Sequence, residues 1–435
     1  MRISVLAAGS RGDIQPYLAL AVGLKHAGHV VRFAANLNFG SLAKAYGLEF
    51  FPLQVDSFAL TREPETQHWL ASRSLPELIW RSRRVVGPIT GRFLADAWEA
   101  CQGAEAMIYH TYTIPTAFVI GQRLGIPCLP ASVNPLPTRA HPSLPLELKA
   151  SLGSPLNLLT HLIEQQITWG VYRSSARAFF GDGRGIPIRA PYFLWREERR
   201  PVVCCYSRHV LPVPPDSPDH IHITGYWFLE TLPDWQPDSA LLQFLDSGPA
   251  PVYVGFGSIG DPARTHETTQ IVLDALAQSG QRGLLEPGWS GLGRGTALSD
   301  SVFVLDSAPH RWLFPRMAAT VHHGGVGTTA AALRAGVPTL AVPHFTDTHF
   351  WGRRVAALGA GPPPIPRRQL TAERLARAIS DAVTNPHMRQ RAAEVGELIR
   401  AEDGIASAIE IFHRYVENCS RATSQSSPST ASAPA

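Results

Sequence analysis

The sequence is poor in several features, and each shortage excludes a class of protein. Five of its 435 residues are cysteines, and they form no CxxC pair and no Cys/His zinc spacing. We therefore expect reduced thiols and a cytoplasmic protein rather than a disulfide or zinc framework. No run of about 18 apolar residues occurs, which predicts that there is no transmembrane helix. The apolar stretch at residues 3–8 is too short for a signal peptide.

Strong charge of either sign is missing as well. Lysine occurs only at Lys25, Lys44 and Lys149, arginine supplies the remaining cations, and the formal net charge is +4. Because there is no basic block, nucleic acid is not an expected partner. No Asp-x-Asp sequence or similar cluster stands out, so we expect no metal ion. The composition leaves open the oligomeric state and contact with a membrane surface.

Apolar residues make up 45% of the chain, which is enough for two domains with separate cores. Strand-like and helix-like segments alternate from residue 3 to residue 36 and again at 106–133. A second alternating series extends from residue 252 to residue 358. Strands that alternate with helices predict parallel sheets covered on both faces. The fold class is therefore α/β, with two doubly wound domains.

Composition also sets the predicted domain boundaries. Prolines cluster between residues 210 and 237, which predicts a linker at 213–238 between an N-terminal domain (1–212) and a C-terminal domain (239–419). Residues 420–435 are rich in Ser, Thr, Ala and Pro and are predicted to be disordered. Aromatic and leucine-rich insertions between about residues 60 and 205 either form a substrate pocket or pack helices onto the sheet.

The stretch HHGGVGT, residues 322–328, carries the strongest functional signal. It lies between a predicted strand and a predicted helix, where open α/β sheets bind ligands. Glycines allow the backbone to come close to a ligand, and a helix start offers free N–H groups and a positive dipole end. We therefore predict a diphosphate site formed by His323 and the backbone of Gly325, Val326, Gly327 and Thr328. A tight turn with locally satisfied histidines is the alternative.

The N-terminal loop contains a second set of candidates, Ser10, Gly12 and Asp13. Its glycines have the spacing GxxG rather than GxGxxG, so it is not a nucleotide-binding fingerprint. Asp13 is either an acid in the first turn of a helix or, if the loop faces the diphosphate site across a cleft, a general base.

Two segments, residues 10–36 and 308–362, resemble nucleotide-sugar-dependent glycosyltransferases of the GT-B fold. The resemblance is to sterol 3-β-glucosyltransferases and to the glycosyltransferases that decorate glycopeptide and macrolide antibiotics. It implies two Rossmann-like domains facing across a cleft, with the nucleotide sugar on the C-terminal domain and the acceptor on the N-terminal domain. It also implies a final helix that crosses back onto the first domain.

The resemblance assigns roles by position. His323 and residues 325–328 would bind the diphosphate with help from Ser258, and the loop with Ser307, Ala308 and His310 would hold the base. Asp347 would contact the sugar hydroxyls, and Asp13 would be the catalytic base beside Ser10. Two positions depart from the family pattern: Thr348 stands where the family usually has Gln, and Ala331 stands where plant enzymes have a ribose-binding Glu. The sugar and the mode of ribose recognition therefore stay open.

The resulting hypothesis is an inverting, metal-independent glycosyltransferase without a cofactor. It would move a hexose or deoxyhexose from a UDP- or TDP-sugar to a hydroxyl of a lipophilic acceptor, such as a natural-product aglycone or a sterol. The alternatives are a GT-B-fold sugar-nucleotide epimerase and a catalytically degenerate nucleotide-sugar-binding protein. An NAD-dependent oxidoreductase is disfavoured by the GxxG loop and by the missing ribose acid.

Overall fold

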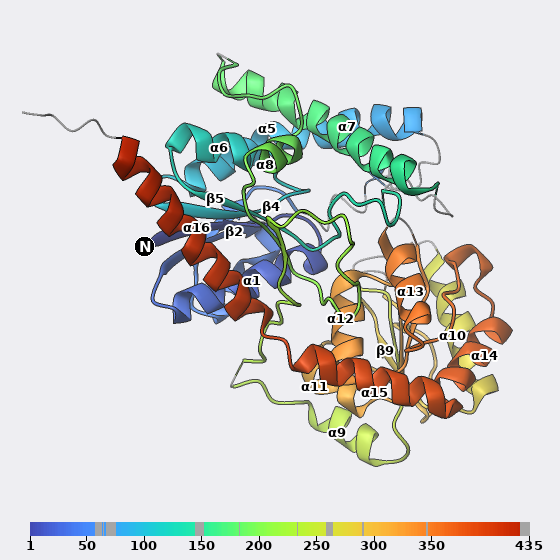
Figure 1. Cartoon of the computed structure of the whole chain (residues 1–435). Helices are drawn as coiled ribbons and strands as arrows, with labels where there is room; N and C mark the ends of the chain where they lie inside the picture. The colour runs from blue at the N-terminus through green and yellow to red at the C-terminus, as the bar shows by residue number, and fades with distance from the viewer. Residues whose placement is uncertain are drawn as a thin grey trace, which may run out of the picture.

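The computed structural model of the chain is built around two parallel β-sheets, one in each half (Figure 1). The residues that the structure describes are 1–56, 63, 65–66, 75–143, 152–181, 183–232, 234–257, 264–288, 291–344 and 347–426. None of the described helices is long and apolar enough to cross a membrane. The predicted α/β class with two doubly wound domains is confirmed.

The first sheet has the strand order β3-β2-β1-β4-β5-β6-β7, and all of its strand pairs are parallel. Parallel strands are covered by helices on both faces, which explains why β1, β4 and β5 consist almost entirely of buried residues. The strands are β1 (Arg2–Leu6), β2 (Val30–Asn36), β3 (Glu49–Leu53), β4 (Ala106–His110), β5 (Cys128–Ser132), β6 (Val202–Cys204) and β7 (Ile221–Ile223).

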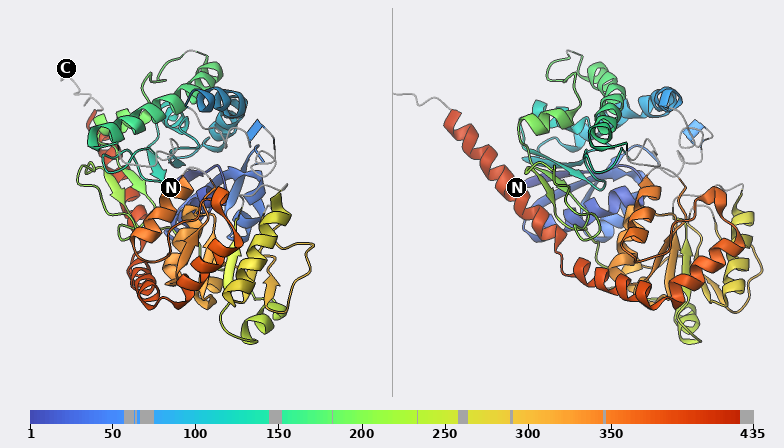
Figure 2. Two further views of the ribbon diagram at one scale, coloured as in Figure 1. Left: turned by 90° about the vertical axis from the view of Figure 1, so that its right-hand side faces the viewer. Right: turned by 45° about the vertical axis from the view of Figure 1, so that its right-hand side comes forward.

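Helices of the N-terminal half cover both faces of this sheet, and the two longest, α5 and α7, lie on its outer side (Figures 1 and 2). The helices are α1 (Arg11–His26), α2 (Gly40–Ala45), α5 (Leu75–Ala100), α6 (Ala117–Leu124), α7 (Ser154–Phe180) and α8 (Pro191–Glu197), with the 3-10 helix η1 (Leu37–Phe39). The aromatic side chains of these helices do pack onto one another, as Trp98 does against Phe180 at a ring distance of 5.4 Å.

The second sheet has the order β10-β9-β8-β11-β12 and is also parallel. Its strands are β8 (Val252–Gly255), β9 (Gly283–Glu286), β10 (Val302–Val304), β11 (Ala319–His322) and β12 (Thr339–Ala341). The helices around it are α9 (Ser239–Asp246), α10 (Thr265–Ser279), α11 (His310–Leu313), α12 (Val326–Ala335), α13 (Asp347–Ala357), α14 (Ala372–Thr384) and α15 (Pro386–Arg400), with η4 (Phe314–Arg316) and η5 (Arg367–Gln369).

The predicted linker at 213–238 is not structureless throughout. It contains β7, whose Ile221 and Ile223 pair with β6, so the first sheet extends into this segment before the chain crosses to the second. Proline-rich flanks concealed this three-residue strand, because so short an apolar run carries almost no periodic signal.

The last helix, α16 (Gly404–Ser426), crosses back onto the N-terminal domain (Figure 2). Residues 420–426, which the sequence predicts to be disordered, belong to this helix. The helix continues because no proline or glycine interrupts it before residue 428, and Arg421 pairs with Glu417 one turn earlier at 3.9 Å. The rest of the predicted tail lies outside the described residues.

Close packing of α16 on α1 holds the crossing in place. His29 and His413 share a hydrogen bond of 2.8 Å between their Nε2 atoms, and Phe412 is fully buried. A Cβ atom on Gly23 of α1 would lie 2.4 Å from Cγ2 of Ile405. The two helices therefore meet at a contact that has room only for glycine.

We expect Gly23→Ala to destabilise the protein by about 1–3 kcal/mol, because the added methyl group overpacks the contact between α1 and α16. The matched control is Gly170→Ala in α7, where an added Cβ meets nothing within 4 Å. That change should stabilise the helix by about 0.5–1 kcal/mol. Thermal unfolding of both variants tests the packing. Changes of Tm with the same sign in Gly23→Ala and Gly170→Ala would contradict it.

Candidate active site

A large cavity lies between the two sheets, and its volume is about 1020 Å³. Loops at the carboxyl ends of strands from both domains line it, as expected for open α/β sheets. The structure brings together all the predicted site residues except Ser258, which lies outside the described residues. They are Ser10, Gly12, Asp13, Ser307, Ala308, His310, His323, Gly325, Val326, Gly327, Thr328, Asp347 and Thr348.

The N-termini of α1 and α12 meet across this cavity. A Cβ atom on Gly327 of α12 would lie 3.6 Å from the Cα atom of Gly12 of α1, which is van der Waals contact. The first N–H groups of a helix have no partner inside the helix, and the dipole makes this end positive. Two positive helix ends that face one cavity form a site for an anion.

Glycine is required at the turn before α12. Gly324 has a φ angle of +87°, and a Cβ atom there would lie 2.7 Å from the carbonyl oxygen of Thr348. A Cβ atom on Gly325 would lie 2.3 Å from Nε2 of His323. The imidazole of His323 therefore packs directly on the backbone at the start of α12, beside the N–H groups that face the cavity.

The two adjacent histidines have different roles. His322 is satisfied locally, since its Nδ1 accepts from the N–H of Gly324 at 2.9 Å and its Nε2 lies 2.8 Å from the hydroxyl of Thr339. His323 lines the cavity, and its buried Nδ1 has no partner among the described residues. Burial lowers the pKa of His323 to about 3, so the ring is neutral and can donate one N–H.

The loop after β10 forms a second wall. Ser307 and Ala308 line the cavity, and the ring of His310 stacks on Phe314 at 4.2 Å. Nε2 of His310 lies 3.4 Å from a carboxylate oxygen of Glu286, which also accepts from the hydroxyl of Tyr253. Burial raises the pKa of Glu286, but the hydrogen bonds from His310 and Tyr253 outweigh it and lower that pKa to about 2.

Glu286 also lines the cavity and was not predicted from the sequence. It is the last residue of β9, and only its place at a strand end could have marked it. An ionised carboxylate that is fixed by two side chains is a strong hydrogen-bond acceptor for hydroxyl groups.

The predicted sugar-binding pair lies at the start of α13. Asp347 and Thr348 both line the cavity, but Thr348 is only 2% exposed and its carbonyl packs against Gly324. Ala331 also lines the cavity, so α12 presents a methyl group where plant enzymes are expected to have a carboxylate. The side chains at positions 331 and 348 are therefore shorter than those of the family pattern.

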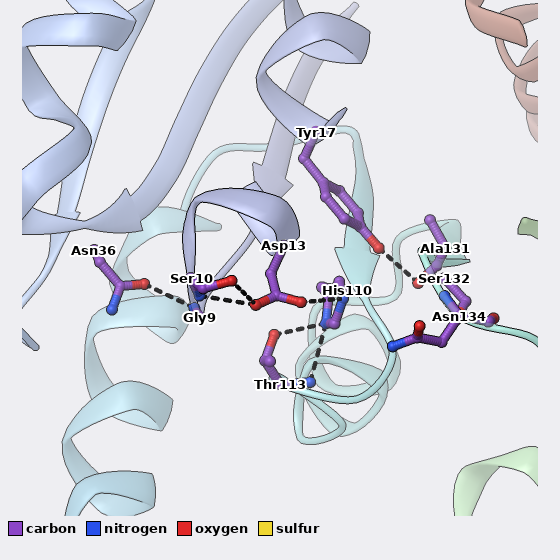
Figure 3. Close-up of polar contacts among 10 residues, drawn as sticks. All are labelled: Gly9, Ser10, Asp13, Tyr17, Asn36, His110, Thr113, Ala131, Ser132 and Asn134. Atoms are coloured by element: carbon purple, nitrogen blue, oxygen red, sulfur yellow. Dashed lines mark hydrogen bonds and ion pairs between the residues drawn. The ribbon is translucent and has the colours of Figure 1, made fainter. Parts of the chain in front are cut away.

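Asp13 caps the start of α1 through its contacts with Ser10 (Figure 3) and also lines the cavity. Its Oδ2 accepts from the backbone N–H and from the hydroxyl of Ser10, both at 2.8 Å. Its Oδ1 has a different neighbour, Nε2 of His110 at 4.0 Å. Gly9 permits this arrangement, because its φ angle is +124° and a Cβ atom there would lie 2.6 Å from Oδ2.

His110, at the end of β4, is a second residue that the sequence analysis missed. Its Nδ1 lies 3.1 Å from the N–H of Thr113 and 2.7 Å from the Thr113 hydroxyl. Because Nδ1 accepts from the backbone, the ring proton sits on Nε2, and this N–H points toward Asp13 (Figure 3). Burial lowers the pKa of His110 to about 4, so the imidazole is neutral.

The N-terminal insertions supply an apolar wall. Val85, Ile89 and Phe93 of α5 and Tyr172 of α7 line the cavity on the side away from the glycine turn. Other aromatics of the insertions pack the helices, as does the buried Trp169, whose N–H donates to the carbonyl of Pro187. Some residues of the insertions therefore line the cavity, and others pack the helices onto one another.

Comparisons with known proteins agree with this geometry. Residues 3–141 match the glycosyltransferase family 28 N-terminal domain, and residues 292–410 match the C-terminal domain of erythromycin biosynthesis protein CIII-like proteins. The chain is 34% identical to the sterol 3-beta-glucosyltransferase UGT80B1 of Arabidopsis thaliana over 435 residues, which cover 96% of this chain and 68% of that protein. The chain therefore belongs to the glycosyltransferase family that includes the sterol 3-beta-glucosyltransferases.

Other relatives and solved structures extend the comparison. A sterol 3-beta-glucosyltransferase of Cryptococcus neoformans is 33% identical across 96% of this chain, which spans 27% of that longer protein. CalG4, the calicheamicin glycosyltransferase, has a TM-score of 0.70 at 18% identity, covering 96% of this chain and 98% of its own. The glycotransferase of kitacinnamycin has a TM-score of 0.68 at 18% identity, with 95% of this chain and 98% of its own covered. The predicted GT-B fold and the resemblance to sterol and antibiotic glycosyltransferases are confirmed.

The neutral His110 of this glycosyltransferase should make stability depend on pH. Its pKa is lowered from an ordinary value of 6.5 to about 4, so between these values the unfolded chain binds a proton that the folded chain does not. Stability therefore falls as the pH drops through this window, and His110 contributes up to about 2 kcal/mol of the loss between pH 7 and pH 5.

We expect His110→Gln to lose correspondingly less stability over that interval than the unaltered protein does. Urea unfolding at both pH values measures this, with His26→Gln on the exposed end of α1 as the control. If His110→Gln lost as much stability between the two pH values as the unaltered protein does, His110 would take up a proton in the folded state.

Proposed function

We propose that the protein transfers a hexose or deoxyhexose from a UDP- or TDP-sugar to a hydroxyl group of a lipophilic small molecule, with inversion at the anomeric carbon. One observation carries the proposal. The glycine turn with His323 and the loop with Asp13 belong to different domains and line the same cavity. A donor on one wall and a base on the other are what a direct displacement needs.

The donor would lie on the C-terminal wall. Its diphosphate would accept from the N–H groups of residues 325–328 and from the neutral imidazole of His323, which lines the cavity beside them. The converging ends of α1 and α12 would stabilise the charge of the leaving nucleoside diphosphate. Asp347 would bind sugar hydroxyls. One relative by fold, SsfS6, was solved with thymidine diphosphate, which supports a diphosphate ligand.

The acceptor would approach from the apolar wall of α5 and α7. Its hydroxyl oxygen would attack the anomeric carbon as the bond from that carbon to the phosphate oxygen breaks, and Asp13 would take the hydroxyl proton. Ser10 holds Oδ2 of Asp13 by two hydrogen bonds, and the N–H of His110 faces Oδ1. These contacts would keep the carboxylate oriented and ionised until it receives the proton.

The lipophilic character of the acceptor rests on the wall that would receive it. Val85, Ile89 and Phe93 are one or more helical turns apart on the same face of α5. The sterol glucosyltransferases to which the chain is similar are named for an apolar acceptor, which supports the same class here. An epimerase would need the donor site but no such wall.

Asp13→Asn should lower kcat by about 10²–10⁴-fold and leave donor affinity unchanged, because the amide cannot take the proton. Asparagine keeps an oxygen for the N–H of Ser10, so the helix cap is retained. The matched control is Glu267→Gln, which also changes a carboxylate in the first turn of a helix. Steady-state kinetics with a panel of nucleotide sugars and acceptors makes the comparison, and wild-type turnover by Asp13→Asn would reduce Asp13 to a cap.

His323→Ala should raise the Kd for UDP or TDP about 10- to 100-fold, since a hydrogen bond to a charged phosphate is lost. Isothermal titration calorimetry measures the affinity, and the exposed His387→Ala on α15 serves as the control. Equal affinities of wild type and His323→Ala for both nucleotides would remove His323 from the donor site. Tight donor binding with neither transfer nor donor hydrolysis would instead favour the degenerate binding protein.

A further inference from the structure

The cavity face of α12 lacks a hydrogen-bonding group where a ribose would be bound. Gly327, Ala331 and Arg334 follow one another at intervals of four and three residues, and all three line the cavity. Side chains at such intervals lie on one face of a helix. In the family pattern this face carries the carboxylate that binds the ribose, whereas position 331 here has a methyl group, which neither donates nor accepts a hydrogen bond.

A carboxylate from the segment that joins the two domains reaches this face. Oε1 of Glu230 lies 4.0 Å from a guanidinium nitrogen of Arg334, and Oε2 of Glu230 pairs with Arg311 of α11. A helical side chain leans toward the N-terminus of its helix, which directs Arg334 toward the turn that contains Ala331. The carboxylate of Glu230 therefore lies close to this turn, and Glu230 also lines the cavity.

Two further contacts hold the pair of Glu230 and Arg334. The guanidinium of Arg334 lies 4.3 Å from the centre of the Phe228 ring, which lines the cavity as well. The backbone carbonyl of Glu230 accepts from the hydroxyl of Tyr46 in the N-terminal domain. An ionised carboxylate has about four lone-pair positions, so Glu230 can still accept from hydroxyl groups while two arginines hold it.

Three other acids line the cavity in the described part of the chain, and they come from other walls. Asp13 lies in α1, Glu286 ends β9 and Asp347 begins α13. Glu230 belongs to none of these elements, yet its carboxylate pairs with a residue of α12 one turn after Ala331. A carboxylate at this place can do what a longer acidic side chain at position 331 does in the family pattern.

We propose that Glu230 supplies the ribose-binding acid that α12 lacks. Its carboxylate accepts hydrogen bonds from the 2′- and 3′-hydroxyls of the donor's ribose, while Arg311 and Arg334 hold it in place. The inference rests on the proposed function, because it requires a nucleotide sugar in the cavity. Since Tyr46 of the N-terminal domain binds the carbonyl of the same residue, the bound ribose also contacts the segment that joins the two domains.

The test is isothermal titration calorimetry with UDP and with 2′,3′-dideoxy-UDP, which lacks both hydroxyl groups. Wild-type protein should bind UDP about tenfold more tightly than the dideoxy nucleotide, because hydrogen bonds to a charged group are lost. Glu230→Gln should weaken UDP binding about tenfold and leave dideoxy-UDP binding unchanged. The matched control is Glu197→Gln in α8, whose side chain is similarly exposed (56% against 62%) and also pairs with an arginine, and which should bind both nucleotides like wild type.

A second variant separates a lost hydrogen bond from a general loss of structure. Glu230→Gln/Ala331→Glu returns a carboxylate to the cavity face of α12 and should recover most of the UDP affinity. Equal UDP affinities of wild type and Glu230→Gln, or an equal loss for UDP and dideoxy-UDP, would overturn the role of Glu230 and leave the proposed function intact. Wild-type protein that binds neither nucleotide would instead reject the proposed function, and this inference with it.

Discussion

The whole arrangement depends on the close approach of two helix ends. α1 begins after the first strand of one sheet, and α12 begins after a strand of the other. The two helix starts come so close that a Cβ atom on Gly327 would lie 3.6 Å from the Cα atom of Gly12. The N-terminal ends of both helices then line one cavity. There is little space between the two helix ends at this point, because that Cβ atom would already be at van der Waals distance. The packing of α16 on α1 and of Trp351 among N-terminal residues such as Tyr206 holds the two domains at this distance.

A neutral, preorganised environment surrounds the acid at the centre. Ser10 fixes one oxygen of Asp13, Thr113 fixes the proton of His110 on Nε2, and Gly9 leaves the space that the carboxylate occupies. His323 on the opposite wall is neutral as well, because burial lowers its pKa to about 3. The positive character of the cavity therefore comes from the oriented backbone dipoles and from lining arginines such as Arg11 and Arg334, and not from His110 or His323.

Both walls of the cavity could be predicted from short stretches of sequence. The glycine turn at residues 322–328 and the strand–loop–helix around Asp13 are recognisable because turn glycines and first-turn acids are determined by the backbone conformation of a few neighbouring residues. His110 and Glu286 were missed because each is one polar residue at the end of an apolar strand, and only the tertiary fold brings them to Asp13 and His310. Strand β7 was missed since its pairing with β6 is a property of the sheet, not of its three residues.

A crystal structure of the protein with UDP or TDP tests the central claim most directly. The account predicts the diphosphate on the N–H groups of Gly325 to Thr328, within hydrogen-bond distance of the His323 ring. It also predicts that the carboxylate of Asp13 faces the terminal phosphate from the other domain, with space between them for a sugar. A diphosphate bound elsewhere in the cavity, or an Asp13 carboxylate turned away from it, would contradict the account.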